Sequence, residues 1–319
     1  MLRADATALA ELFGVGEPSA MQETARGAMG AVWRLETETG TYAAKELFWF
    51  EGDVGSVRRE VAFRTACAAA GVRSPEPLAS VSGEYVVRHE GVWWRLYEWA
   101  EGDVPDHLDI EVTTWLAQQM AVIHALDWPG GELEPVPFYH QVDVDWDELV
   151  DTALRAGVEW ADDLRRAQPQ LLELTSLVNA EPVGDQVWCH RDLKNSNVLR
   201  PASNVAEGNW LVDWDNVGPL SPERELGALL MWHLHNPADL RRLVTGYHAA
   251  GGPAEITGPA SFATGLAISL NFLHGQAALA MDTGHAETHR RYATRQVAGV
   301  ISGLPDLAQL KTVADVSRT

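Results

Sequence analysis

The pattern of apolar and polar positions changes about a third of the way along the chain. Up to residue 99, apolar residues come in short alternating runs that are typical of strands. Four such runs are predicted as strands: residues 31–36, 41–47, 84–89 and 92–99. Turn-forming residues join them in pairs, at residues 37–40 and at Glu90-Gly91. One helix is predicted between the pairs, over residues 57–70, with Ser56 as its N-cap and Gly71 as its stop.

From residue 100 onward, the apolar positions follow the 3.6-residue period of helices. Helices are predicted over four stretches: residues 112–126, 146–156, 161–178 and from about 223 onward. Two short apolar stretches, residues 186–199 and 209–215, interrupt this pattern, and the first of them contains a run of polar residues. We therefore predict an α+β fold with a small antiparallel-sheet N-terminal lobe over residues 1–99 and a helical C-terminal lobe over residues 100–319.

Composition narrows the class of protein. The 319 residues carry 45 acidic and 24 basic side chains, a formal charge of −21, and such a surface repels the phosphates of nucleic acids. It would attract a polycationic substrate; the alternative is that the charge serves solubility alone. Asp5 and Glu11 stand where a signal peptide has its apolar core, and no run reaches about 18 uninterrupted apolar residues. With Cys67 and Cys189 as buried thiols, we expect a cytoplasmic monomer or homodimer that binds neither nucleic acid nor membrane.

The strongest chemical signal is a polar loop that follows the apolar Val187-Trp188. It reads Cys189-His190-Arg191-Asp192-Leu193-Lys194-Asn195-Ser196-Asn197, and Leu211-Val212-Asp213-Trp214-Asp215 comes later in the chain. Phosphoryl transfer needs a group that orients and deprotonates the attacking hydroxyl, and metal ions that neutralise the phosphates. An Asp and an Asn five positions apart can supply a base and a metal-binding oxygen, and a second Asp after an apolar strand supplies another. The alternative interpretation is that these are ordinary polar residues at a strand end.

The spacing His190-x-Asp192-x-x-x-x-Asn197, followed by Asp213-Trp214, resembles the catalytic loop and metal-binding segment of the aminoglycoside phosphotransferase and choline kinase branch of the kinase superfamily. The resemblance spans about residues 22–229. It implies a protein-kinase-like two-lobed fold that moves the γ-phosphoryl group of ATP, or of GTP, to a hydroxyl of a small molecule. By resemblance, Asp192 is the catalytic base and His190 braces the loop, while Asn197 and Asp213 hold Mg²⁺.

Two positions depart from the commoner form of the family. Arg191 stands where a glycine is usual, and Lys194 follows Leu193 as in protein kinases. Lys194 is predicted to reach the transferring phosphoryl group and offset its charge; the alternative is an exposed loop lysine. The acidic residue that the family places before a Leu in the following helix corresponds to Glu225.

The resemblance also implies nucleotide-binding residues in the N-terminal lobe. The glycines before the first strand let backbone N–H groups approach phosphates. Lys45 lies on the less polar face of its strand and Glu60 on the inward face of the helix with Phe63 and Cys67. The family makes Lys45 and Glu60 the ion pair that orients the α- and β-phosphates; the alternative for each is a surface charge. The predicted nucleotide-binding residues are Gly27, Ala28, Met29, Gly30, Lys45, Glu60 and, at a hinge for the nucleobase, Glu98, Trp99 and Ala100.

The acceptor is predicted to be a small molecule rather than a protein. Protein kinases place an activation segment and an Ala-Pro-Glu motif after the metal-binding Asp, whereas here the chain enters a predicted helix near Glu225, soon after Asp213. Acidic residues near tryptophans suit a cationic acceptor such as an aminoglycoside or a basic peptide antibiotic. The candidates for acceptor binding are Asp145, Glu159, Asp215, Glu225 and Trp232.

Three alternatives stay open at this point. The acidic residues can be helix caps, and the tryptophans can be core residues. The acceptor can be a metabolite, such as an amino alcohol, a hydroxy amino acid or a sugar. A non-catalytic nucleotide-binding pseudokinase would keep the fold but would be expected to lose the base or the metal ligands. The chain keeps all of them: Asp192, Asn197 and Asp213, together with Lys45.

Overall fold

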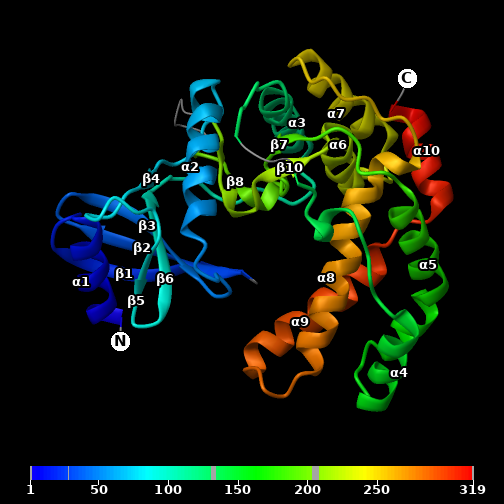
Figure 1. The fold of residues 1–319 in the computed structure, drawn as a ribbon, viewed down its shortest axis with the longest axis horizontal. Coiled ribbons are helices and arrows are strands. Elements are labelled where there is room, and N and C mark those ends of the chain that lie inside the picture. The colour runs from blue at the N-terminus through cyan, green and yellow to red at the C-terminus, as the bar shows by residue number, and fades with distance from the viewer. Residues whose placement is uncertain (1, 28, 131–133, 203–207, 318–319) are drawn as a thin grey trace. The chain divides into compact units, whose positions relative to one another are not determined.

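In the computed structural model, residues 2–27, 29–130, 134–202 and 208–317 are described, and Figure 1 shows the order of their elements. The chain divides into two compact units, each built from several stretches. The first unit comprises Met1–Asp109, Trp128–Gly130 and Lys194–Val217, and the second comprises Ile110–Asp127, Gly131–Leu193 and Gly218–Thr319. The chain thus passes from the second unit to the first between Leu193 and Lys194, inside the predicted catalytic loop. The predicted lobe boundary at residue 100 stays a prediction.

The first unit is built on an antiparallel sheet of strand order β1-β2-β3-β6-β4, to which β5 adds by pairing with β6. Its elements are α1 (Leu2–Phe13), β1 (Pro18–Arg26), β2 (Gly30–Thr37), β3 (Gly40–Leu47), α2 (Val54–Ala69), β4 (Pro77–Leu78), β5 (Val87–His89), β6 (Val92–Glu98), η2 (Asn195–Asn197), β8 (Val198–Leu199), β9 (Trp210–Leu211) and η3 (Trp214–Asn216). The four predicted strands correspond to β2, β3, β5 and β6, and β2 and β3 form the predicted hairpin with Thr37 opposite Gly40.

Strands β1 and β4 and helix α1 of the first unit are absent from the sequence-based prediction. Strand β1 has no buried position, so it carries no alternation of apolar and polar residues that marks a strand. Helix α1 buries Leu9 and Phe13 in a cluster with Leu35 and Leu96 of the sheet. The sheet therefore has a second covering element beyond the one predicted helix, which is α2.

Helix α2 begins earlier than predicted. Its N-cap is Asp53, whose Oδ1 accepts a hydrogen bond from the backbone N–H of Ser56 at 3.0 Å, so Ser56 lies inside the helix. The predicted inward face is confirmed, because Glu60, Phe63 and Cys67 are all buried. Because Glu60 lies on this face, α2 buries the Glu60 carboxylate against the sheet.

The second unit is mostly helical, as predicted. Its elements are α3 (Ile110–His124), η1 (Pro137–Tyr139), α4 (Trp146–Ala156), α5 (Ala161–Ala180), β7 (Val187–Cys189), β10 (Gly218–Leu220), α6 (Pro222–Leu230), η4 (Met231–His233), α7 (Pro237–Ala249), η5 (Pro259–Phe262), α8 (Ala263–Met281), α9 (Glu287–Gly303) and α10 (Leu307–Ser317). Gly227 lets α6 approach η5, because a Cβ there would lie 2.0 Å from the carbonyl oxygen of Ser261. Within the described ranges, no helix is both long and apolar enough to cross a membrane.

A buried imidazole makes the stability of the second unit depend on pH. His140 is 8% exposed, and its Nδ1 lies 3.4 Å from Nη1 of Arg224. Burial, together with the charges of Arg224 and Arg191, lowers the pKa of His140 to about 4, below the 6.5 of an unfolded chain. Between these two values the unfolded state binds more protons than the folded state, so stability is lost as the pH falls from 6.5 towards 4.

We expect the His140→Gln variant to lose less stability on acidification than the unmodified protein. The difference in free energy of unfolding between pH 7 and pH 4.5 should be smaller by about 1–2 kcal/mol, a range that allows for screening by nearby solvent. Urea unfolding at pH 7, 5.5 and 4.5 measures it for both proteins, and the carboxylates common to both cancel in the comparison. Equal losses in the two proteins would show that His140 does not carry this pH dependence.

Candidate active site

The predicted base lies on a loop with a strained backbone. Strand β7 ends at Cys189, which pairs with Gly218 of β10, and leads into the fully buried His190. Arg191 has a φ of 64°, a left-handed conformation that costs a residue with a side chain about 1–3 kcal/mol. This is the position where the family commonly has glycine, which adopts such a φ freely. Asp192 follows directly and is half-buried.

Three features around Arg191 offset the cost of this conformation. Its backbone N–H donates a hydrogen bond to Oε1 of Glu225. Its guanidinium carbon lies 4.3 Å from the ring centroid of Tyr139, a cation–π contact. Gly218 leaves room for the side chain, because a Cβ there would lie 2.7 Å from the same guanidinium carbon. The arginine therefore ties the loop to η1 and β10, which a glycine has no side chain to do.

Glu225 of α6 belongs to a buried hydrogen-bonded chain. Its Oε2 lies 2.7 Å from Nε2 of His124, whose Nδ1 lies 2.9 Å from the hydroxyl of Tyr247. Burial alone would raise the pKa of Glu225, but the hydrogen bond and the charge of His124 outweigh it and lower the pKa below its usual range. Glu225 is 3% exposed and both its oxygens have partners, which favours a structural role in holding the predicted catalytic loop. Its contact with an acceptor stays a prediction.

The two predicted metal ligands lie at one end of the short ladder formed by β8 and β9. Val198 pairs with Leu211, and the carbonyl oxygen of Asn197 accepts a hydrogen bond from the N–H of Val212 at 2.9 Å. Asp213 comes next, with a left-handed backbone at φ 64°. An amide oxygen and a carboxylate are hard oxygen donors of the kind that Mg²⁺ prefers, so these residues fit the metal. Their role as ligands stays a prediction.

The start of η2 is fixed within the first unit by a buried amide. Nδ2 of Asn195 donates hydrogen bonds to the carbonyl oxygens of Asp106 and Asp109, both at 3.0 Å. Lys194, directly before η2, is half-buried. Its predicted contact with the transferring phosphoryl group stays a prediction.

Lys45 of β3 has two carboxylate partners, and neither is the predicted one. Its Nζ lies 2.6 Å from Oδ1 of Asp213 and 2.7 Å from Oδ2 of Asp215. Burial alone would lower the pKa of Lys45, but the charges of Asp215 and Asp213 outweigh it and raise the pKa, so the side chain is an ammonium ion. The predicted Lys45–Glu60 ion pair is wrong for this structure, because another cation holds Glu60.

That cation is Arg95 of β6, a site residue that the sequence pattern does not select. Arg95 lies opposite Lys45 in the β3–β6 register and is 2% exposed. Its Nη1 lies 2.5 Å from Oε2 of Glu60 and 2.9 Å from Oδ1 of Asp215. One signal was present: a single arginine inside an otherwise apolar run needs a carboxylate partner when that run is buried.

The phosphate-loop candidates form the turn between β1 and β2. The N–H of Gly27 donates to the carbonyl oxygen of Gly30 at 2.9 Å, and Met29 is exposed. Gly30 has a steric reason to be glycine, because a Cβ there would lie 2.2 Å from the carbonyl oxygen of Glu46 on β3. Ala28 lies outside the described residues. Phosphate binding by this turn stays a prediction.

The hinge candidates lie where β6 ends. The N–H of Glu98 donates to the carbonyl oxygen of Glu76 at 2.9 Å, so this amide is already engaged. Nε1 of Trp99 donates to Oε1 of Glu101 at 2.9 Å, and Ala100 is buried. Binding of a nucleobase by this segment stays a prediction.

Two acidic residues predicted to bind a cationic acceptor have surroundings that favour the structural alternative. Asp145 is the N-cap of α4, and its Oδ1 accepts a hydrogen bond from the N–H of Glu148 at 2.9 Å. Glu159 lines a groove with Trp160, and α9 contributes three arginines to the same groove: Arg290, Arg291 and Arg295. These guanidinium groups would repel a cation.

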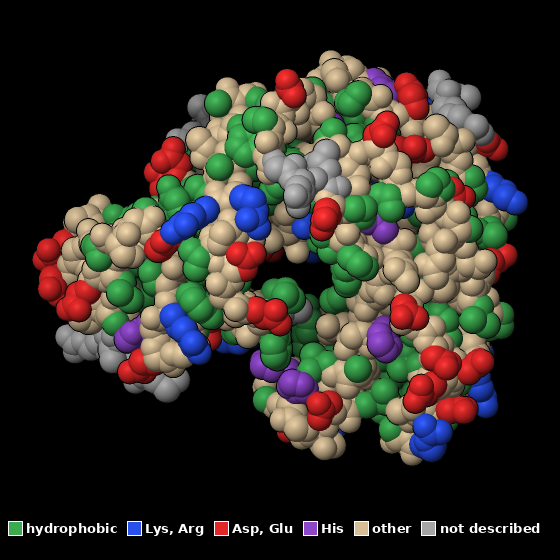
Figure 2. Space-filling view, viewed as in Figure 1, with side chains coloured by type: hydrophobic (Ala, Val, Ile, Leu, Met, Phe, Trp, Pro, Cys, Tyr) green, Lys and Arg blue, Asp and Glu red, His purple; other side chains and the backbone are tan. Residues whose placement is uncertain are grey.

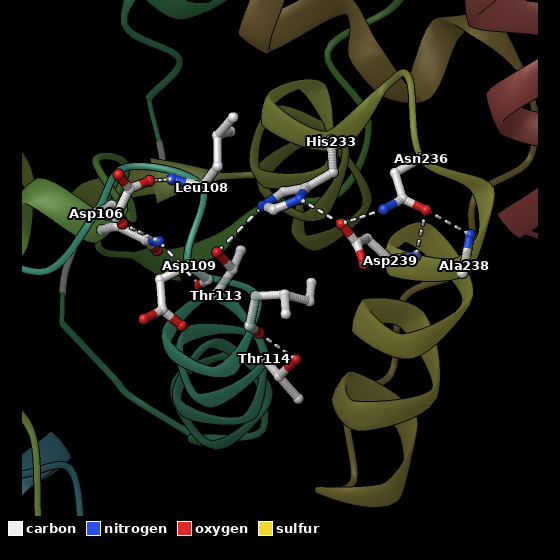
Figure 3. Close-up of polar contacts among 11 residues, drawn as sticks. Asp106, Leu108, Asp109, Thr113, Thr114, His233, Asn236, Ala238 and Asp239 are labelled. Atoms are coloured by element: carbon white, nitrogen blue, oxygen red, sulfur yellow. Dashed lines mark hydrogen bonds and ion pairs between the residues drawn. The ribbon is translucent and has the colours of Figure 1, made fainter.

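Trp232 of η4 is 53% exposed, whereas three other tryptophans are core residues: Trp146, Trp160 and Trp214. Figure 3 shows the contacts of His233, which hold η4 in place. The His233 ring lies 3.1 Å from Oγ1 of Thr113 on α3 and 3.4 Å from Oδ2 of Asp239 on α7. Nδ2 of Asn236, the N-cap of α7, donates to the same Asp239 oxygen at 2.8 Å. Trp232 is therefore presented to solvent from a fixed turn.

Figure 2 shows acidic side chains in several places on the face drawn, with groups at its left edge and at its lower right. Their role in binding an acceptor stays a prediction.

Comparison with known proteins gives a family and a fold. Residues 21–262 match the model of the phosphotransferase enzyme family. A spectinomycin phosphotransferase in complex with ADP and spectinomycin has a TM-score of 0.70 at 13% identity, covering 96% of this chain and 98% of that one. A microcompartment-associated aminopropanol kinase has 0.63 at 15% identity, covering 99% and 98%. An amicoumacin kinase in complex with AMP-PNP and Ca²⁺ has 0.61 at 14% identity, covering 95% of each chain. No curated protein sequence matches the chain.

At these identities, the solved structures show the fold. They confirm the predicted α+β, protein-kinase-like architecture with an antiparallel sheet followed by a mostly helical remainder. The family match covers most of the chain and confirms the resemblance drawn from the motifs at Asp192 and Asp213, and with it an ATP-dependent phosphotransferase that acts on an alcohol group. The chain belongs to the phosphotransferase enzyme family.

Proposed function

We propose that this protein transfers the γ-phosphoryl group of ATP to a hydroxyl of a small, amine-bearing molecule. The observation that carries the proposal is the contact of the Lys45 ammonium ion with Asp213, beside Asn197 at the end of the β8–β9 ladder. A half-buried cation next to two hard oxygen donors suits a triphosphate and its metal ion. The ADP and the AMP-PNP with Ca²⁺ in two of the similar structures support a nucleotide and a divalent cation as ligands.

Each residue has a defined task in this proposal. Lys45 binds phosphate oxygens through its ammonium group. Asn197 and Asp213 would hold Mg²⁺, which supplies positive charge that neutralises the phosphates. Asp192 orients the acceptor hydroxyl and takes its proton while the oxygen bonds to the γ-phosphorus. The bond between that phosphorus and the bridging oxygen breaks, and ADP leaves.

Two acceptor classes compete. The spectinomycin phosphotransferase and the amicoumacin kinase favour an antibiotic, whereas the aminopropanol kinase favours a metabolite of the amino alcohol type. The surroundings of three predicted acceptor residues give less support to a polycation: Asp145 caps α4, Glu159 lies in a groove with three arginines, and Glu225 is buried. An amino alcohol and an aminoglycoside both carry a hydroxyl and an amine, so we take these two groups as the chemistry of the acceptor. Both cysteines are buried thiols, which supports a cytoplasmic location.

A panel assay tests this function. Purified protein with Mg²⁺ and either ATP or GTP is given spectinomycin, amicoumacin, a set of aminoglycosides, aminopropanol, choline and ethanolamine in turn. We expect acceptor-dependent release of the nucleoside diphosphate with at least one of them, and a product heavier by one phosphoryl group in mass spectrometry. Nucleotide binding without release above the level of Asp192→Asn, across the whole panel, would favour the pseudokinase alternative.

A further inference from the structure

A half-buried lysine and a buried arginine stand side by side on the sheet of the first unit and share one carboxylate. Lys45 and Arg95 are opposite residues in the β3–β6 register. The oxygens of Asp215 divide between them: Oδ2 lies 2.7 Å from Nζ of Lys45, and Oδ1 lies 2.9 Å from Nη1 of Arg95. Because the guanidinium is a rigid planar group, Asp215 holds the flexible lysine at a fixed place beside it.

Arg95 also forms an ion pair with Glu60, so Glu60 is not available to Lys45. Its Nη1 lies 2.5 Å from Oε2 of Glu60, and the two side chains are 2% and 5% exposed, so water cannot replace either partner. If Glu60 moved to Lys45, a buried guanidinium would lose one of its two carboxylates. Leaving a buried charge short of partners is unfavourable, so the arrangement keeps Glu60 on Arg95 and Asp215 on both cations.

The charges of this cluster balance only when Asp215 is included. Arg64 of α2 adds a third cation, which is buried, with its guanidinium carbon 5.2 Å from the ring centroid of Tyr97 and 5.9 Å from that of Trp214. Three cations, Lys45, Arg64 and Arg95, stand with three carboxylates, Glu60, Asp213 and Asp215. When Asp213 serves a metal ion, as the proposed function requires, Asp215 is the carboxylate that stays in contact with Lys45.

We propose that Asp215 performs the task that the family resemblance gives to Glu60: it positions Lys45 for the phosphates of the nucleotide. Arg95 is a second positioning residue, which holds Asp215 and Glu60 in place. This inference rests on the proposed function for the identity of the ligand, an Mg²⁺-bound nucleoside triphosphate. It moves Asp215 from the predicted acceptor residues to the nucleotide side of the site.

Nucleotide affinity separates Asp215 from Glu60 without any turnover. Isothermal titration with AMP-PNP and Mg²⁺ compares the unmodified protein with Asp215→Asn and Glu60→Gln, which keep the side-chain shapes. Glu46→Gln is the matched control, because Glu46 is a β3 carboxylate hydrogen-bonded to Trp33 at 3.1 Å, on the opposite face of the strand from Lys45. We expect Asp215→Asn to raise Kd at least about tenfold, and Glu60→Gln and Glu46→Gln to change it less than about threefold.

Lysine labelling gives a second readout that needs no ligand. The chain has only three lysines, Lys45, Lys194 and Lys311, and Lys311 on α10 is an exposed internal reference. An amine reacts faster when one of the carboxylates that stabilise its ammonium form is removed, and Asp215→Asn leaves Lys45 with Asp213 alone. The labelling rate of Lys45 relative to Lys311, measured by mass spectrometry with an amine-reactive ester, should rise at least about fivefold in Asp215→Asn and stay within about twofold in Glu60→Gln.

The outcomes distinguish the inference from the proposed function. If Glu60→Gln weakens AMP-PNP binding or speeds Lys45 labelling as much as Asp215→Asn does, Asp215 is not the positioning carboxylate and the inference fails. If the unmodified protein binds no nucleotide, the proposed function fails, and the labelling rates still decide which carboxylate holds Lys45. Arg95→Lys, which keeps the charge but loses the Nη1 that contacts both Glu60 and Asp215, should raise Kd in the unmodified background and have no further effect in Asp215→Asn. If the effects of Arg95→Lys and Asp215→Asn on Kd add independently, Arg95 does not act by positioning Asp215.

Discussion

Asp192→Asn should lower kcat for phosphoryl transfer by about 10²–10⁴-fold while changing the nucleotide Kd by less than about threefold. The asparagine keeps the size of the side chain but cannot accept the proton of the acceptor hydroxyl. The contacts proposed for the phosphates come from Lys45, Asn197 and Asp213, all of which belong to the first unit and are unchanged. The loop conformation is set by Arg191 and Glu225, so it should persist in the variant.

Steady-state kinetics with a saturating acceptor and titration with AMP-PNP measure the two quantities separately. Asp185→Asn is the matched control, since Asp185 is an exposed aspartate shortly before β7. Its kcat should equal that of the unmodified enzyme. A kcat for Asp192→Asn within threefold of the control would exclude Asp192 as the base.

Glu225→Ala should have the largest effect on stability, a loss of about 3–5 kcal/mol in the free energy of unfolding. The substitution removes the carboxylate between His124 and the N–H of Arg191 and leaves both buried donors without their acceptor. It also removes the hydrogen bond that helps to hold Arg191 at a positive φ. We therefore expect kcat to fall in this variant even at a temperature where it is fully folded.

Urea unfolding measures the stability, and kcat at 15 °C measures the effect on the loop. Glu225→Gln is the conservative comparison: it keeps an oxygen for the Arg191 N–H but loses the charge, so it should cost only about 1–2 kcal/mol and retain more of the activity. A loss of less than about 1 kcal/mol in Glu225→Ala would mean that the buried chain through His124 and Tyr247 contributes little to folding.

Periodicity predicts the elements that bury one face, and it fails where burial gives no signal. The strands β2, β3, β5 and β6 and the helices α2 to α5 all follow from apolar spacing. β1 lacks that spacing, because none of its positions is buried. α1 does carry helical spacing in Ala6, Leu9, Ala10 and Phe13, so the same rule was sufficient to find it. Asp53 and Ser56 are both good N-caps by residue type, so the sequence does not choose between them. The hydrogen bond from the Ser56 N–H to Asp53 identifies Asp53 as the cap.

In the candidate site, residues close together in the sequence were predictable, whereas partners from distant parts of the chain were not. The spacing of Asp192, Asn197 and Asp213 along the chain is local information, and it led to the family. The partner of Lys45 is not local, because Glu60, Asp213 and Asp215 come from distant parts of the sequence. Which carboxylate pairs with the lysine depends on how many buried cations compete for them, and Arg95 changes that number. The partner of Lys45 can therefore be identified only when the positions of the strands and α2 are known.

The close approach of Arg191 to Gly218 makes the effect of a substitution at one of these positions depend on the other. A side chain at 218 would crowd the guanidinium and shift it from Tyr139, so the arginine would keep its unfavourable φ with a weaker stabilising contact. Positions 191 and 218 therefore form a coupled pair, and the effects of substitutions at the two are not expected to add.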